Sequence, residues 1–149
     1  LKSDPQNPLI WFCGRCHCCK RSPIHSLLAQ NIVPVCCAIT HDKNGQLLNT
    51  NADTIASEIA IAMSSHFEVT LSYCFEKKGV LKDEEEENSV IPILTSVAYK
   101  TLKKEKTIHS GMLPKIHNCF EALKKGVAHV RIGNPKMITE KVIHTQIQL

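Results

Sequence analysis

Apolar residues occur along the chain in short continuous runs that alternate with helical patterns. Residues 32–39, IVPVCCAI, are almost entirely apolar and predict a buried strand. From residue 51 onward apolar positions follow a helical period, at Ile55, Ile59 and Met63. Residues 66–74, HFEVTLSYC, predict the next strand. A strand, a helix and a strand in this order indicate a right-handed βαβ crossover in a parallel sheet.

The second half of the chain continues this alternation. A short helix is expected over Thr95–Lys103, with Thr95 or Ser96 accepting hydrogen bonds from its first amides. Residues 111–126 predict a stronger helix, because Ile116, Phe120 and Leu123 share one face. Pro114 suits its first turn, and Gly126 stands where it would stop.

Two further strands complete the expected fold. VAHVRI, at residues 127–132, predicts a strand, and TQIQL at residues 145–149 predicts a last strand at the edge of the sheet. The predicted class is therefore α/β, with a mainly parallel sheet and flanking helices.

Composition fits one soluble globular domain or half of a larger one. The chain has 149 residues, of which 43% are hydrophobic and 21% charged. Its longest apolar run, at residues 32–39, is far shorter than the roughly 20 residues that span a bilayer, so no membrane association is expected. The start shows no secretory leader and lacks Met, which hints at truncation. We expect a cytoplasmic protein whose eight cysteines are reduced thiols or metal ligands.

Charge argues against a nucleic-acid partner. The formal charge of +4 is not accompanied by an array of aromatic residues, which make up only 5% of the chain. The acidic run at residues 83–87 predicts a solvated loop.

Candidate chemistry lies at two junctions, residues 47–57 and 109–115, where a loop leads into a predicted helix. Helix N-termini attract anions, and Lys115 would add a full positive charge one turn inside the second helix. Lys115 is thus the candidate for a phosphate contact, with a solvated surface lysine as the alternative. Asn49, Asn51 and Asp53 are candidates for a polar site, or equally for turn and capping residues.

Three motifs, in order, resemble the C-terminal part of acetylglutamate kinases of the amino acid kinase fold. They are LLNTNADTIASEIAIAMSS, LSYCFEKKGVL and SGMLPKIHNCFEALKKGV. The resemblance covers residues 24–149. It implies transfer of the γ-phosphoryl group of ATP to the side-chain carboxylate of N-acetylglutamate, on the route to arginine.

The same resemblance implies roles for individual residues. Lys115 resembles the lysine that draws charge toward the nucleotide phosphates, and Asp53 the aspartate that orients catalytic lysines. Asn49 and Asn51 are the implied substrate-binding residues. The implied nucleotide-binding residues are Ser72, Tyr73, Gly79, Val80, Leu81, Gly111 and Met112. ATP would bind with Mg²⁺, no metal ligand is assigned to the protein, and the full-length form is expected to be a homo-oligomer.

One stretch departs from the common pattern of the family. Tyr73 and Cys74 stand where many relatives have an acidic turn, and YCFEKKGVL resembles the variant of a bacterial subgroup. In that subgroup the substrate is N-acetylglutamate or N-succinylglutamate, and the sequence does not separate the two.

The first 23 residues form a separate, Cys-rich segment that does not match the family. A family member would begin with a strand, a glycine-rich loop with a lysine, and an arginine for the substrate, and none of these is found here. Read one nucleotide late, codons for the stretch from Trp11 onward permit the family motif Gly-x-Val-Gly-x-Val-x-x-Val-Asn. We therefore interpret residues 1–23 as frameshifted, and expect the chain alone to be inactive.

Two alternatives remain open at this point. The first is a zinc-binding interaction module, because Cys13 and Cys16 have C-x2-C spacing and nearby residues offer further ligands: His17, Cys18, Cys19, Cys36 or Cys37. Adjacent residues of a strand point to opposite faces, so only one of the last two could join such a site. The second alternative is a nucleotide-binding remnant without catalysis.

Overall fold

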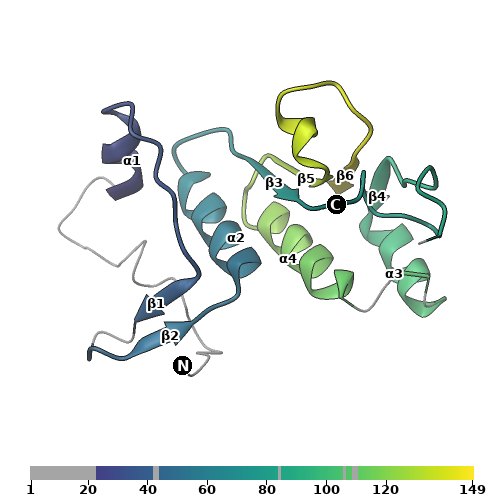
Figure 1. The fold of residues 1–149 in the computed structure, drawn as a ribbon, viewed down its shortest axis with the longest axis horizontal. Helices are drawn as coiled ribbons and strands as arrows, with labels where there is room; N and C mark the ends of the chain where they lie inside the picture. The colour runs from purple at the N-terminus through teal and green to yellow at the C-terminus, as the bar shows by residue number, and fades with distance from the viewer. Residues whose placement is uncertain (1–22, 42–43, 84, 106, 109–110) are drawn as a thin grey trace.

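The computed structural model describes residues 23–41, 44–83, 85–105, 107–108 and 111–149 (Figure 1). The helices are α1 (Pro23–Leu28), α2 (Ala52–Met63), α3 (Ser96–Lys104), α4 (Met112–Lys124) and the short 3₁₀ helix η1 (Pro135–Ile138). The strands are β1 (Ile39–His41), β2 (Leu47–Asn49), β3 (Thr70–Cys74), β4 (Ile93–Thr95), β5 (His129–Gly133) and β6 (Thr145–Gln148).

A four-stranded sheet with the order β3-β5-β6-β4 organises the larger part of the molecule. The pairs β3–β5 and β4–β6 are parallel, whereas β5–β6 is antiparallel. Helices α2, α4 and α3 lie along one face of this sheet (Figure 1). The expected α/β class, with a mainly parallel sheet and flanking helices, is confirmed.

The core lies between this sheet and α4. Strand side chains pack there against one face of the helix, and the apolar alternation along each strand selects which residues point inward. The residues with 0–2% exposure in this layer are Leu94, Ile116, Cys119, Ala122, Val130, Ile132 and Ile147. The α4 face predicted from its helical period is therefore the buried face.

Local capping signals define the ends of the two later helices. The Thr95 hydroxyl accepts a hydrogen bond from the Ala98 amide at 3.2 Å, so α3 begins one residue after the expected start. In α4, Pro114 lies in the first turn, and the helix ends at Lys124. Gly126 then has φ of 101°, a left-handed conformation that favours glycine.

The prediction of a buried strand over residues 32–39 is wrong. Only Ile39 belongs to a strand, β1, which pairs antiparallel with β2 in a separate two-stranded sheet. Val33 and Val35 are 80% and 96% exposed. A buried extended segment needs a neighbouring strand to satisfy its backbone groups, and within the described part of the chain no strand lies against residues 32–38. The expectation that Cys36 and Cys37 occupy opposite faces of a strand is wrong for the same reason.

The predicted topology needs two corrections. The parallel partner of β3 is β5, which follows it in sequence, and not a strand before α2, so the expected crossover through α2 is wrong. TQIQL does form a strand, but β6 lies inside the sheet between β5 and β4. Residues 134–144 reverse the chain direction after β5, which returns β6 to an interior position that its place in the sequence does not indicate.

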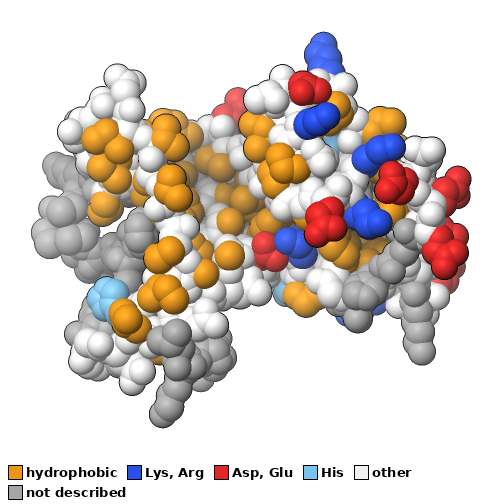
Figure 2. Space-filling view, viewed as in Figure 1, with side chains coloured by type: hydrophobic (Ala, Val, Ile, Leu, Met, Phe, Trp, Pro, Cys, Tyr) orange, Lys and Arg blue, Asp and Glu red, His pale blue; other side chains and the backbone are white. Residues whose placement is uncertain are grey.

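Charged and apolar side chains are unevenly distributed over the surface. On the face in Figure 2, hydrophobic side chains gather over the region of α1, β1 and β2, while Lys, Arg, Asp and Glu gather over the region of the four-stranded sheet. The acidic run contributes to the second group, because Asp83 and residues 85–87 are exposed. The expected solvated loop is confirmed for these residues.

Candidate active site

An ion pair joins the N-terminal ends of two helices. Lys115, in the first turns of α4, donates to both carboxylate oxygens of Asp53 in the first turn of α2, at 3.0 Å to Oδ1 and 2.9 Å to Oδ2. The side chains are 19% and 30% exposed, respectively. The two residues are 62 positions apart in the sequence, so only the packing of α2 against α4 brings them together.

Asn51 fixes the start of α2 and with it the position of Asp53. Its side-chain oxygen accepts hydrogen bonds from the amides of Asp53 and Thr54, at 2.8 and 3.2 Å. This is the N-capping arrangement that satisfies amides at a helix start. The carboxylate of Asp53 in the first turn is also stabilised by the helix dipole. The capping interpretation of Asn51 is confirmed.

Tyr73 lies beneath the ion pair. Its hydroxyl donates to the backbone carbonyl of Asp53 at 2.9 Å, and the Lys115 ammonium is 5.1 Å from the centroid of its ring. The side chain is buried, and burial raises the pKa of the phenol well above its ordinary value of 10.0. The hydroxyl therefore stays protonated at neutral pH and acts as a donor.

Cys119 lies one helical turn beyond Lys115 on α4 and is fully buried. Burial raises the pKa of its thiol to about 12, although the positive charge of Lys115 acts in the opposite direction. A thiol with so high a pKa is protonated at neutral pH and is not a nucleophile. Cys119 therefore contributes packing next to the ion pair.

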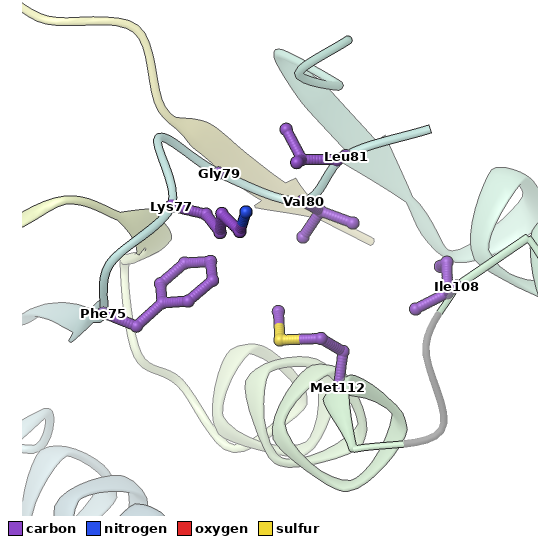
Figure 3. Close-up of a pocket in the computed structure, with 7 residues that line it drawn as sticks. All are labelled: Phe75, Lys77, Gly79, Val80, Leu81, Ile108 and Met112. Carbon is purple, nitrogen blue, oxygen red and sulfur yellow. The ribbon is translucent and has the colours of Figure 1, made fainter. Parts of the chain in front are cut away.

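A pocket of about 270 Å³ opens beside the start of α4 (Figure 3). In the close-up, the Phe75 ring and the Met112 side chain point into the space between the loop of residues 77–81 and the start of α4. The lining residues are Phe75, Lys77, Gly79, Val80, Leu81, Ile108 and Met112. A mostly apolar pocket with one lysine at its border suits a flat, uncharged ring that carries an anionic group.

The structure brings together part of the predicted nucleotide set. Four of its members line the pocket: Gly79, Val80, Leu81 and Met112. Gly111 immediately precedes α4, next to Met112. Ser72 and Tyr73 do not line the pocket, since the Ser72 hydroxyl accepts a hydrogen bond from Arg131 Nε at 2.8 Å and Tyr73 contacts Asp53. Asn49, the last residue of β2, is exposed.

Thr145 holds the pocket loop and was not predicted. Its hydroxyl accepts a hydrogen bond from the Val80 amide at 2.8 Å and donates to the Ile91 carbonyl at 2.7 Å. A Cβ atom on Gly79 would lie 2.6 Å from that hydroxyl oxygen, so glycine is required for this close approach. Thr145 is 65 positions from Val80, and no local signal indicates the contact.

The other unpredicted residues had a signal in the sequence. Phe75 and Lys77 lie inside the motif LSYCFEKKGVL, and Ile108 directly precedes the junction at residues 109–115. The motif indicated the segment, but the side chains that face the cavity depend on how the loop turns after β3.

The proposed zinc ligands at Cys13, Cys16, His17, Cys18 and Cys19 lie outside the described residues. Among the residues that are described, no group of three or more His, Cys, Asp or Glu side chains could hold a metal ion. In the same part of the chain, no helix is long and apolar enough to cross a membrane.

The ion pair and the pocket meet at the start of α4. Met112 borders the pocket, and Lys115 follows it three positions later. The N-terminus of a helix and a lysine ammonium both favour anions. The start of α4 therefore combines an apolar pocket, a helix N-terminus and the Lys115–Asp53 ion pair.

A profile of the amino acid kinase family matches residues 5–134. The chain is 53% identical over 107 residues to an acetylglutamate kinase of Parabacteroides distasonis, covering 72% of this chain and 42% of the relative. It is 50% identical over 115 residues to that of Phocaeicola vulgatus, covering 77% and 45%.

The fold has solved counterparts too. Streptococcus mutans smu.665 matches with a TM-score of 0.68 and 27% identity, covering 84% of this chain and 46% of that protein. The chain thus spans less than half the length of the relatives that it matches. The profile covers most of the chain, so the chain belongs to the amino acid kinase family.

Proposed function

We propose that residues 24–149 form the nucleotide-binding part of an acetylglutamate kinase. Such an enzyme transfers the γ-phosphoryl group of ATP to the side-chain carboxylate of N-acetylglutamate or N-succinylglutamate in arginine biosynthesis. The relatives named acetylglutamate kinase, at 53% and 50% identity, support this function. The observation that carries it is the Lys115–Asp53 ion pair beside an apolar pocket.

Lys115 and Asp53 are the proposed catalytic residues. Phosphoryl transfer depends mainly on alignment of the reacting groups and on neutralisation of charge on the phosphoryl oxygens. The ammonium of Lys115 would stabilise this charge from the start of α4. Asp53 would hold the ammonium in place, because both of its carboxylate oxygens accept from it.

The pocket is the proposed site of the adenine ring. Its apolar side chains, among them Phe75 and Met112, offer surfaces for stacking and burial of a flat base. Lys77 and the backbone of residues 79–81 would lie toward the ribose and phosphates. ATP would arrive with Mg²⁺, which neutralises phosphate charge, and no protein ligand for the ion is assigned.

The remaining parts of the proposal concern the acyl-amino-acid substrate and the whole enzyme. Asn49 and Asn51 are the proposed substrate-binding residues, near the start of α2. Other groups of the site would come from the part of the relatives that the match does not cover. The boundary after residue 23, a cytoplasmic location and a homo-oligomeric full-length form also belong to this proposal.

The test uses a chimera in which residues 24–149 replace the matching part of the Parabacteroides distasonis relative. We expect acyl phosphate, trapped with hydroxylamine, when ATP, Mg²⁺ and N-acetylglutamate or N-succinylglutamate are supplied. Lys115→Ala should lower kcat by about a hundredfold or more, since the charge on the phosphoryl oxygens is greatest in the transition state.

Lys124→Ala is the matched control, because Lys124 lies on the same helix but is exposed and pairs with Glu121 at 2.8 Å. Its kcat should equal that of the unsubstituted chimera. The 149-residue chain alone should bind ATP without turnover. A chimera that folds but forms no acyl phosphate with either substrate would refute the proposed function, and an unchanged kcat in Lys115→Ala would refute the role of Lys115.

A further inference from the structure

Tyr73 is the only described aromatic residue that contacts both members of the Lys115–Asp53 pair. It lies in the edge strand β3 opposite Ile132 of β5, so its backbone is held by pairing with β5. From this fixed position its side chain reaches the first turn of α2 and the start of α4. One side chain thus links the strand and the two helices that carry the ion pair.

We propose that Tyr73 is a positioning residue that sets the place of Lys115 relative to Asp53. A role of Tyr73 in catalysis rests on the proposed function. The contacts of Tyr73 with Asp53 and Lys115 are present in the structure without any ligand. This role is separate from the implied nucleotide contact of Tyr73, which does not line the pocket.

The hydroxyl of Tyr73 acts on Asp53. It donates to the backbone carbonyl of Asp53 at 2.9 Å, and the buried phenol stays protonated, so this bond persists through the neutral pH range. The Asn51 side-chain oxygen accepts a hydrogen bond from the amide of Asp53 at 2.8 Å. The backbone of Asp53 is therefore held by two side chains from different elements, which limits where its carboxylate can lie.

The ring of Tyr73 acts on Lys115. An ammonium within about 6 Å of an aromatic ring centroid is attracted to the face of the ring, and the distance here is 5.1 Å. The Lys115 side chain is only 19% exposed, so water competes weakly for this contact. Without the ring, the long lysine side chain would keep Asp53 as a partner but gain freedom to turn toward solvent.

Neither a neighbouring thiol nor a general packing role accounts for these contacts. Cys119 is also buried and its pKa is affected by the charge of Lys115, but its thiol offers no ring for the ammonium. Tyr99 provides a comparison, because its ring packs on Phe120 at 5.4 Å and its hydroxyl donates to the Leu113 carbonyl at 3.4 Å. Tyr99 links α3 to α4 without touching the ion pair.

The first test needs no ligand and uses the 149-residue chain. Lysines are labelled with ¹³C at Cε, and the Lys115 signal is identified by its loss in Lys115→Arg. We expect its protons to be displaced to lower chemical shift by the Tyr73 ring, to stay displaced in Tyr73→Phe, and to move to the position of exposed lysines in Tyr73→Leu. An unchanged position in Tyr73→Leu would overturn the proposal.

The second test measures the consequence for anion binding in the same chain. The affinities for ATP and for adenosine are compared by calorimetry or fluorescence. Tyr73→Leu should weaken ATP binding by about two- to fivefold, the range of an exposed to partly buried cation–π contact, and leave adenosine binding unchanged. Tyr73→Phe should recover part of the loss, because it keeps the ring.

The matched control is Tyr99→Leu, which removes a similar ring from the core but should change neither the Lys115 signal nor the ratio of ATP to adenosine affinity.

If the unsubstituted chain binds no ATP, the proposed function fails, and the Lys115 signal alone decides the positioning role. If ATP binds but Tyr73→Leu leaves the affinity ratio unchanged, the positioning role fails and the proposed function stands. If Tyr73→Leu does not fold, Tyr73→Phe tests the positioning role instead. A displaced Lys115 signal together with weaker ATP binding supports the role, and ATP binding equal to that of the unsubstituted chain overturns it.

Discussion

The molecule has two parts that are both rich in apolar residues but bury them very differently. In the sheet part, residues 52–149, Val130 and Ile132 are fully buried. In the N-terminal part, the described residues from 23 to 50, Val33 and Val35 are 80% and 96% exposed. Residues 32–39 and residues 127–132 both predict a strand in the sequence. Only the second segment has neighbouring strands on both sides and a helix that covers it.

The difference shows that an apolar run indicates a tendency to be buried and does not supply the partner. β5 lies between two strands and beneath α4, so its backbone groups and its side chains are both satisfied. Within the described part of the chain no strand lies against residues 32–38, and Pro34, Cys36 and Cys37 only border a pocket with residues of α2. Charge follows the same division, since residues 23–41 contain no Lys, Arg, Asp or Glu.

Hydrogen exchange should show the largest contrast between the two parts. The amide of Val130 lies in the central strand β5 and should exchange only on global unfolding. The amide of Val35 should exchange at least about a thousandfold faster, because no strand protects it. Exchange followed by NMR in the 149-residue chain measures both sites. Comparable protection of the two amides would mean that residues 32–38 are covered in solution.

The same substitution in each part should show the next largest contrast. Val130→Ala removes two buried methyl groups and leaves a cavity, so the free energy of unfolding should fall by about 2 to 3 kcal/mol. Val35→Ala should change it by less than about 0.5 kcal/mol, because the side chain is exposed in both states. Urea unfolding followed by circular dichroism measures both. Equal losses would contradict the division into two parts.

Alkaline pH should weaken the sheet part through Cys119. Burial raises the pKa of this thiol to about 12 from an ordinary value of 9.0, so the unfolded chain releases the proton at lower pH than the folded chain. The stabilisation is complete below about pH 9, and above it the free energy of unfolding should fall by about 1.4 kcal/mol per pH unit.

Cys119→Ala should make this fall less steep between pH 9 and 10, whatever its effect on stability at neutral pH. The matched control in the N-terminal part is Cys37→Ala, whose cysteine is exposed. It should keep the wild-type slope in urea unfolding measured at each pH. A wild-type slope in Cys119→Ala would show that the thiol is not buried in solution.

Two nearby asparagines should show the smallest contrast. Asn51→Ala removes the cap of α2, so it should lower the free energy of unfolding by about 1 kcal/mol. Asn49→Ala, at the exposed end of β2, should change it by less than about 0.5 kcal/mol. Thermal and urea unfolding of both variants measure the difference. An equal effect would mean that the hydrogen bonds of Asn51 do not stabilise the helix.

The sequence determined the elements whose signals are local. The helical periods, the Asn51 and Thr95 caps and Gly126 after α4 depend on residues a few positions apart, and α2, α3 and α4 formed where these signals indicated. The helix junctions and the family motifs both indicate Asp53 and Lys115 in the sequence. Nothing local indicates that the two side chains meet, because they are 62 positions apart.

The tertiary structure decided what depends on contacts between distant segments. It left residues 32–38 without a neighbouring strand, placed β6 inside the sheet, brought Thr145 to the pocket loop and put Tyr73 against the ion pair. A strand forms only where a neighbouring strand accepts and donates its backbone hydrogen bonds. A hydroxyl donates to the carbonyl that the packing of distant segments places within hydrogen-bond distance. Hydrophobic burial is proportional to area and has no direction of its own, so an apolar pattern states that a segment favours burial, whereas only the assembled fold determines against what.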